Sequence, residues 1–290
     1  MKPLRARIRD AASSAGVGEH VVEKDYALSY ILAGIAAQPD LSESMVFKGG
    51  TALKKLFFGD YRFSEDLDFS SLGSPRGDDL DHAVRQAVAH SISLLSEQGA
   101  FALEVVRYVE RHPHPHGQEA FVIRARFPWH PGPLCRVKLE ISHDEPVLLE
   151  PDSRTLIHGY EENLDVSVRC YRLEEIIAEK LRCLLQTQKK LLARGWNRPR
   201  ARDYYDLWRL LTAFDGVIDK AVLPSILHQK CLHRSVGYSC ADDFFSDELT
   251  HEARTHWDGN LRPFVSQLPS CEIVIAELKV LVRQLLPFTG

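Results

Sequence analysis

Hydrophobic and polar positions alternate with different periods along the first hundred residues. Apolar residues between positions 19 and 36 recur at helical spacing, which predicts an amphipathic helix that ends at Gln38-Pro39-Asp40. Short apolar runs at 45–47 and 67–70 predict two strands. Between these strands, Gly49 and Gly50 predict a tight turn, followed by a short helix that starts at Thr51.

A strict two-residue period follows in the middle of the chain. A helical pattern over 78–98 and an extended segment over 101–108 precede it. Apolar residues then occupy every second position in 121–127 and again in 137–141, on either side of a Pro/Gly turn. This alternation predicts two paired strands with one face against a core.

Strand patterns end before about Tyr160, and helical patterns fill the remainder of the chain. The predicted helices cover 173–193, 201–213, 220–228 and 273–286. We therefore predict an α+β fold with a boundary near residue 165. One domain, 1–165, carries a mixed sheet with flanking and N-terminal helices, and the other, 166–290, is helical.

The composition is that of a soluble globular protein. The 290 residues are 44% hydrophobic and 26% charged, with a formal net charge of −4. The longest apolar stretch is too short to span a membrane, and the basic N-terminus leads to no signal-peptide core, so we expect a cytoplasmic protein without a membrane partner. Six scattered cysteines without a C-x-x-C pair indicate reduced thiols rather than a zinc ribbon. The motif His112-Pro-His-Pro-His116 is more typical of an extended loop than of a metal site.

Two acidic residues stand two positions apart on the second predicted strand. Residues at this spacing project from the same face of a strand, so Asp66 and Asp68 point together while their apolar neighbours face the core. Paired carboxylates on a rigid strand suit Mg²⁺, which accepts one or two carboxylates together with substrate phosphates. A solvated acidic strand end is the alternative.

The glycine turn upstream favours the metal interpretation. Gly49 and Gly50 let the backbone approach a ligand closely, and the helix start at Thr51 offers unpaired N–H groups to a phosphate. The Thr51 hydroxyl could bind a phosphate oxygen or simply cap the helix. A phosphate cradle followed within twenty residues by a carboxylate pair points to phosphoryl or nucleotidyl transfer.

A third carboxylate is available on the strand over 136–141. Glu140 lies on the polar face of that strand, and it would join Asp66 and Asp68 if the two strands are neighbours. There it could accept the proton of an attacking hydroxyl. Alternatively, Glu140 forms a surface ion pair with Lys138 or Arg136.

The helical half carries two charges within apolar helix faces. Lys180 falls among the leucines and isoleucines of its helix, and Asp203 falls between Leu207 and Leu210. The lysine could extend to solvent and the aspartate could cap its helix. The alternative is that both face a cleft between the domains, where they meet phosphates or the other carboxylates.

Positive charge is concentrated between these two residues. Residues 180–209 contain nine Lys and Arg but only two acidic residues, a net charge of +7 that leaves −11 for the rest of the chain. A basic loop with an aromatic side chain can hold a nucleic-acid backbone and stack on a base, although a solvated loop would look the same. The candidate RNA-binding residues are Arg194, Trp196, Arg198 and Arg200.

Several ordered motifs together resemble the AbiEii family of nucleotidyltransferase toxins, which are related to the MenT toxins. The motifs are Glu23-Lys-Asp-Tyr26, Val46-Phe-Lys-Gly-Gly-Thr-Ala-Leu53, Arg62-Phe-Ser-Glu-Asp-Leu-Asp-Phe69, Glu175-Ile-Ile-Ala-Glu-Lys-Leu181 and Arg202-Asp-Tyr-Tyr-Asp-Leu207.

This resemblance implies a DNA-polymerase-β-like core and a helical C-terminal domain that closes the active-site cleft. It implies that an NMP is transferred from an NTP to an acceptor, plausibly the 3′ end of a tRNA, and that an antitoxin is encoded nearby. On the matching positions, the triphosphate would contact Gly49, Gly50 and Thr51, with help from Arg62 and Ser64. Asp66 and Asp68 would hold Mg²⁺, Lys180 and Asp203 would complete the catalytic site, and Glu140 matches a third acid whose use varies.

Two other functions remain compatible with these motifs. The acceptor could be a protein or small-molecule hydroxyl instead of RNA, or the chain could be a non-catalytic module that binds a nucleotide or nucleic acid.

Overall fold

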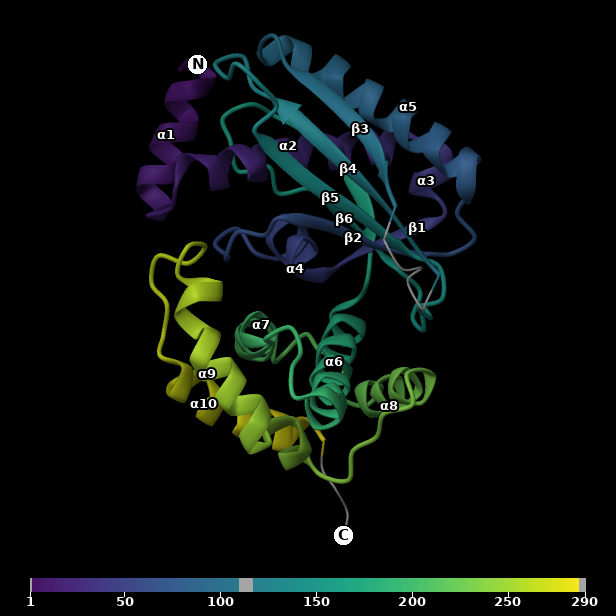
Figure 1. The fold of residues 1–290 in the computed structure, drawn as a ribbon, viewed down its shortest axis with the longest axis vertical. Coiled ribbons are helices and arrows are strands. Elements are labelled where there is room, and N and C mark those ends of the chain that lie inside the picture. The colour runs from purple at the N-terminus through teal and green to yellow at the C-terminus, as the bar shows by residue number, and fades with distance from the viewer. Residues whose placement is uncertain (1, 110–116, 287–290) are drawn as a thin grey trace. The chain divides into compact units, whose positions relative to one another are not determined.

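The computed structural model describes residues 2–109 and 117–286, and the chain divides into two compact units (Figure 1). The first unit is Met1–Tyr171 and the second is Arg172–Gly290. The motif His112-Pro-His-Pro-His116 lies outside the described residues.

The first unit is built on a mixed sheet of seven strands. Their order across the sheet is β3-β4-β5-β2-β1-β7-β6. The pairs β2/β5 and β1/β7 are parallel, and the other neighbours are antiparallel. The strands are β1 (Met45–Lys48), β2 (Asp66–Ser71), β3 (Ala102–Tyr108), β4 (Gln118–Arg126), β5 (Cys135–Ser142), β6 (Asp152–Thr155) and β7 (Ser167–Cys170).

Helices of the first unit pack on one another and on this sheet. The two long ones, α2 (Glu19–Ala37) and α5 (Gly77–Leu95), lie against each other, and α5 runs beside β3 (Figure 1). The predicted alternation on β4 and β5 is confirmed, because every second side chain is fully buried. The shorter helices are α1 (Leu4–Ala15), α3 (Pro39–Ser42), α4 (Gly49–Ala52), the π-helix η1 (Leu53–Phe57) and the 3₁₀-helix η2 (Ser96–Gln98).

Three expectations for this unit are wrong. Helix α2 is buried on nearly all sides instead of being amphipathic, because its polar residues find buried partners. The helix after the glycine turn begins at Gly49, two residues before Thr51. A strand follows Tyr160, since β7 completes the sheet together with the earlier strand β6, and such four-residue, half-polar segments carry too little periodicity to be recognised.

The second unit is helical, as its sequence predicts. Its central helix α6 (Leu173–Arg194) packs against α7 (Ala201–Ala213) and α8 (Leu223–His233), and α7 packs against α9 (Asp247–Leu261) and α10 (Cys271–Leu285). A 3₁₀-helix, η3 (Ala241–Phe245), precedes α9.

Two details of the second unit differ from the prediction. Helix α8 starts at Leu223 rather than Lys220, with Pro224 in its first turn, where a missing N–H costs nothing. Helix α9 was missed because its buried residues, at four-residue intervals, stand among many polar ones. None of the helices in the described ranges is long and apolar enough to cross a bilayer. The six cysteines are free thiols.

Candidate active site

Asp66 and Asp68 lie on β2, a central strand of the sheet. The Cα of Asp68 is in register with Lys48 at the end of β1 and with Glu140 on β5, so these three residues form one row across three strands. Asp66 is in register with Lys138. Register partners share a face of the sheet, so both aspartates and Glu140 project to the same side, as expected. Lys48 also lies beside Asp68, although it was not among the predicted site residues. Its only signal in the sequence is its position directly before Gly49 and Gly50.

The glycine turn lies directly against the Asp68 carboxylate. Gly49 adopts a φ of +80°, and a Cβ built on it would stand 2.6 Å from Oδ2 of Asp68. A Cβ on Gly50 would overlap the Arg62 guanidinium and would lie 3.2 Å from the Ser64 hydroxyl. A side chain is disfavoured at Gly49 by both its φ and the Asp68 carboxylate, and one at Gly50 would displace the end of the Arg62 side chain. The turn, the loop and the carboxylate strand therefore lie close together.

Thr51 links α4 to β2, the strand that carries the two aspartates. Its side chain is buried, and its hydroxyl donates a hydrogen bond to the backbone carbonyl of Asp66. It does not cap the helix, since Lys48 occupies the N-cap position and no side chain caps there. The hydroxyl proton is thus committed to positioning Asp66, and a ligand would meet the backbone of the turn rather than this side chain's O–H.

The loop between η1 and β2 is held in place by its own charged residues. Arg62 is buried, with its Nη1 donating to the carbonyl of Phe63 at 3.3 Å. Glu65 accepts from Lys24 of α2 at 2.9 Å. The Arg62 guanidinium is therefore pre-positioned next to Gly50 before any ligand binds.

Glu140 combines the two arrangements that its sequence allowed. It is the register partner of Asp68, and its Oε1 also accepts hydrogen bonds from Lys138 Nζ at 2.6 Å and from Gln118 Nε2. The ion pair with Lys138 is therefore confirmed. Because both contacts engage Oε1, the second oxygen, Oε2, remains for other chemistry.

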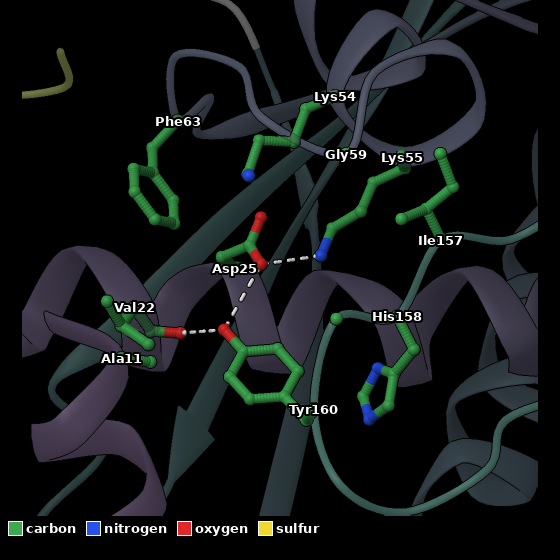
Figure 2. A pocket seen from close by; sticks show the side chains of 11 residues that line it. Ala11, Val22, Asp25, Lys54, Lys55, Gly59, Phe63, Ile157, His158 and Tyr160 are labelled. Carbon is green, nitrogen blue, oxygen red and sulfur yellow. Dashed lines mark hydrogen bonds and ion pairs between the residues drawn. The ribbon is translucent and has the colours of Figure 1, made fainter. Parts of the chain in front are cut away.

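The motif Glu23-Lys-Asp-Tyr26 on α2 contacts the segments next to the site. Asp25 Oδ2 accepts from Lys55 of η1 at 2.6 Å and from Tyr160 at 3.1 Å (Figure 2). Burial lowers the pKa of Lys55, while the Asp25 carboxylate opposes this shift. Both residues are buried, so the pair ties the helix that follows the glycine turn to α2.

A small cavity of about 100 Å³ adjoins this ion pair. Figure 2 shows Lys54 extending its ammonium toward the other oxygen of Asp25, Oδ1, which has no hydrogen-bond partner among the described residues. Lys54 also lies over the ring of Phe63 at 4.5 Å. The cavity therefore lies among the side chains that hold η1 and the following loop against α2.

Tyr26, the last residue of the motif, anchors α2 to the loop before β7. Its hydroxyl donates to Glu162, which also forms an ion pair with Arg7 of α1 and lies 3.3 Å from Nε2 of His158. Although burial opposes it, the nearby His158 ring and the hydrogen bond from Tyr26 lower the pKa of Glu162 to about 2.

In the second unit, Lys180 and Asp203 contact each other. Lys180 Nζ lies 2.8 Å from Asp203 Oδ1 and 2.7 Å from Asp206 Oδ2, and Arg200 Nη1 lies 3.2 Å from Asp203 Oδ2. Neither simple alternative holds, because the lysine is buried instead of extending to solvent and the aspartate does not cap α7. Against the effect of burial, Lys180 and Arg200 hold the pKa of Asp203 below its usual value.

The basic segment divides into internal and exposed charges. Arg200 donates to Thr187 at 2.8 Å besides its pair with Asp203, so this candidate RNA-binding residue is occupied within the unit. In contrast, Arg194, Trp196 and Arg198 are exposed, with Trp196 69% accessible. Nearby, burial and the charges of Arg200 and Arg194 lower the pKa of Lys190.

The carboxylates offer a limited set of metal ligands. Over the described ranges no group of three or more His, Cys, Asp or Glu side chains is arranged to hold an ion. Asp66 and Asp68 together supply hard oxygen donors on one face, beside a turn kept open by glycine. This set fits Mg²⁺, which needs one or two carboxylates and takes its other ligands from water and phosphate.

Comparisons with known proteins agree with this architecture. The sequence profile of the family described as "Nucleotidyl transferase AbiEii toxin, Type IV TA system" matches residues 30–279. Among solved structures, the fold is similar to MenT4, a nucleotidyltransferase toxin from Mycobacterium tuberculosis H37Rv, with a TM-score of 0.62 and 20% identity. The match covers 98% of this chain and 88% of that one. A search of curated proteins found no match.

Proposed function

The chain belongs to the AbiEii family of nucleotidyltransferase toxins of type IV toxin–antitoxin systems. From this premise we propose that it transfers an NMP from an NTP to RNA, at the 3′ end of a tRNA. The observation that carries the proposal is the contact of the glycine turn with both Asp68 and Arg62. Phosphate-binding backbone and paired carboxylates at one point are what nucleotidyl transfer requires.

In the proposed reaction each residue has a stated role. The backbone at Gly49 and Gly50 and the Arg62 guanidinium bind the triphosphate, with Ser64 as a further donor. Asp66 and Asp68 hold Mg²⁺, which when bound neutralises the phosphates and polarises the α-phosphate. The buried Thr51 keeps Asp66 in position.

Glu140 is proposed as the group that accepts the proton of the acceptor hydroxyl, through its Oε2. The acceptor oxygen forms a bond to the α-phosphorus while the bond from that phosphorus to the β-phosphate bridging oxygen breaks. Pyrophosphate leaves, and the proton passes to the carboxylate.

The second unit is proposed to complete the site. In this proposal the helical domain, 166–290, closes over the core, 1–165, and Lys180 meets the phosphates while Asp203 and Asp206 orient its ammonium. Exposed Arg194, Trp196 and Arg198 support an RNA acceptor over a small-molecule or protein hydroxyl, because small acceptors need no exposed basic and aromatic surface. The family further supports a cognate antitoxin as a partner and the cytoplasm as the place of action.

The test is transfer of labelled nucleotide to RNA. Purified protein is incubated with each α-labelled NTP, Mg²⁺ and total tRNA, beside the Asp68→Asn variant. We expect one or more NTPs to label RNA, and the label to be lost in the variant and on addition of EDTA. Absence of RNA labelling with every NTP, in protein that is folded by circular dichroism, would refute the proposal. Labelling of a protein or small molecule instead would identify the alternative acceptor.

A further inference from the structure

The face of the sheet that carries Asp66 and Asp68 continues across β5, β4 and β3, where long side chains are exposed around the buried Ala120 and Val122. The apolar side chains on the core side of β4 and β5 are buried, whereas the opposite side exposes Arg124, Arg126 and Arg136. Arg136 is two residues from Lys138, the register partner of Asp66. With strands about 4.8 Å apart and a rise of about 3.3 Å per residue, its Cα lies on the order of 8 Å from that of Asp66.

The positive charges of these three arginines repel one another. Arg124 and Arg136 are direct cross-strand partners, an arrangement of like charges that destabilises a sheet. Arg126 adds a third charge on the same face, two residues along β4. Glu104, the register partner of Arg124 on β3, is exposed and forms no ion pair with it.

Within the part of the chain that the structure describes, none of the three arginines is held by an acidic side chain, although Glu104 lies across from Arg124. There, Arg124, Arg126 and Arg136 make no hydrogen bond and no ion pair. Arg107, on the core side of β3, shows the contrast, since it is paired with Glu119. Three adjacent unpaired arginines on a rigid sheet are complementary to a polyanion.

Aromatic and apolar side chains complete this surface. Val106 and Tyr108 on β3 are 50% and 41% exposed and project to the same face as the arginines. Lys138 Nζ lies 5.1 Å from the centre of the Tyr108 ring. An exposed ring on a sheet next to arginines is a platform on which an unpaired base can stack while its phosphates meet the charges.

We propose that this face, which we call the sheet platform (Val106, Tyr108, Arg124, Arg126 and Arg136), binds the single-stranded 3′ segment of the acceptor RNA and leads its end to Asp66 and Asp68. The proposal rests on the proposed function for the nature of the acceptor. It places a second RNA contact in the first unit, separate from the loop around Trp196. A single strand fits better than a duplex, because stacking on Tyr108 requires an unpaired base.

The experiment measures RNA binding without catalysis. A 5′-fluorescein-labelled, 12-nucleotide single-stranded RNA is titrated with full-length protein in EDTA without NTP, and anisotropy is followed at several salt concentrations. We expect the Arg124→Gln/Arg126→Gln/Arg136→Gln variant to bind at least tenfold more weakly. Its salt slope should fall by about two, since each phosphate contact on a single strand contributes about 0.7. Tyr108→Ala should weaken binding about fivefold or more without changing the slope.

Two further variants serve as controls. Arg9→Gln/Arg85→Gln/Arg262→Gln removes the same charge from exposed arginines that are already paired with acids, and should bind like wild type. Replacement of the three platform arginines by Lys should keep most of the salt slope. Because removal of like charges relieves repulsion, the Gln variant should unfold at a temperature no lower than wild type.

The outcomes separate this proposal from the proposed function. Wild-type affinity and slope in the platform Gln variant, or equal losses in both triple Gln variants, would overturn the platform even if tRNA is labelled. A selective loss of RNA binding in a protein that labels no RNA would support the platform and refute nucleotidyl transfer to RNA. Preferential binding of the matching RNA duplex would also overturn the single-strand assignment.

Discussion

A Cβ on Gly49 would lie 2.6 Å from Oδ2 of Asp68. Gly49 also has a φ of +80°, where an L-residue is strained by about 1–2 kcal/mol. Gly49→Ala should therefore both destabilise the first unit and displace Asp68. Since a displacement of about 1 Å can cost on the order of 10²-fold in rate, we expect nucleotidyl transfer to fall by at least that factor.

The chain contains a matched control for this variant. Gly73 has a φ of +89°, but a Cβ built there meets nothing within 4 Å. Gly73→Ala should thus lower the free energy of unfolding by about 1 kcal/mol and leave transfer unchanged. Equal losses of activity in the two alanine variants would show that the contact with Asp68 is irrelevant.

The ion pair of Glu140 with Lys138 allows its two roles to be separated. If Glu140 accepts a proton, Glu140→Gln should lower kcat by about 10²-fold or more, while Lys138→Gln should leave kcat at saturating acceptor close to wild type. If the ion pair alone matters, both variants should lower thermal stability alike and neither should affect kcat. Steady-state kinetics and thermal unfolding of the two variants and their double mutant decide between these outcomes.

Arg198 and Arg200 should differ in what their removal costs. Arg200 bonds to Asp203 and Thr187, and hydrogen bonds to charged groups contribute about 1.5–3 kcal/mol. Arg200→Gln should lower the free energy of unfolding by about that amount. The exposed Arg198 should contribute less than about 0.5 kcal/mol to stability, so Arg198→Gln should weaken RNA binding only. Chemical denaturation and RNA titration of both variants measure this; a destabilised Arg198→Gln would contradict the division.

The sequence predicted the carboxylates of the site better than the buried residues that hold the site in place. The alternating pattern predicted that Asp66 and Asp68 share a face, because strand period sets the direction of side chains within one strand. Glu140 was expected beside them only if the two strands were neighbours, and that pairing is known only from the fold. The partners of Asp25 and Tyr26 could not be predicted, since Lys55 and Glu162 reach them from distant segments. Buried polar pairs of this kind also explain why α2 lacks the polar face that its composition suggested. Likewise, Arg200 could be counted as a charge, but only the fold shows that Asp203 neutralises it.

Glu162 should make the stability of the first unit depend on pH. Its pKa is lowered from 4.5 to about 2 in the folded protein, so folding favours the ionised carboxylate. The resulting stabilisation is present in full above pH 4.5 and is lost as the pH falls toward 2. Glu162→Gln, which removes the charge that faces Arg7, should be destabilised relative to wild type at pH 7, and this difference should shrink steadily between pH 4.5 and 2. Urea denaturation of both proteins across this range measures the difference; a gap that stays constant with pH would show that Glu162 acts through packing rather than through its charge.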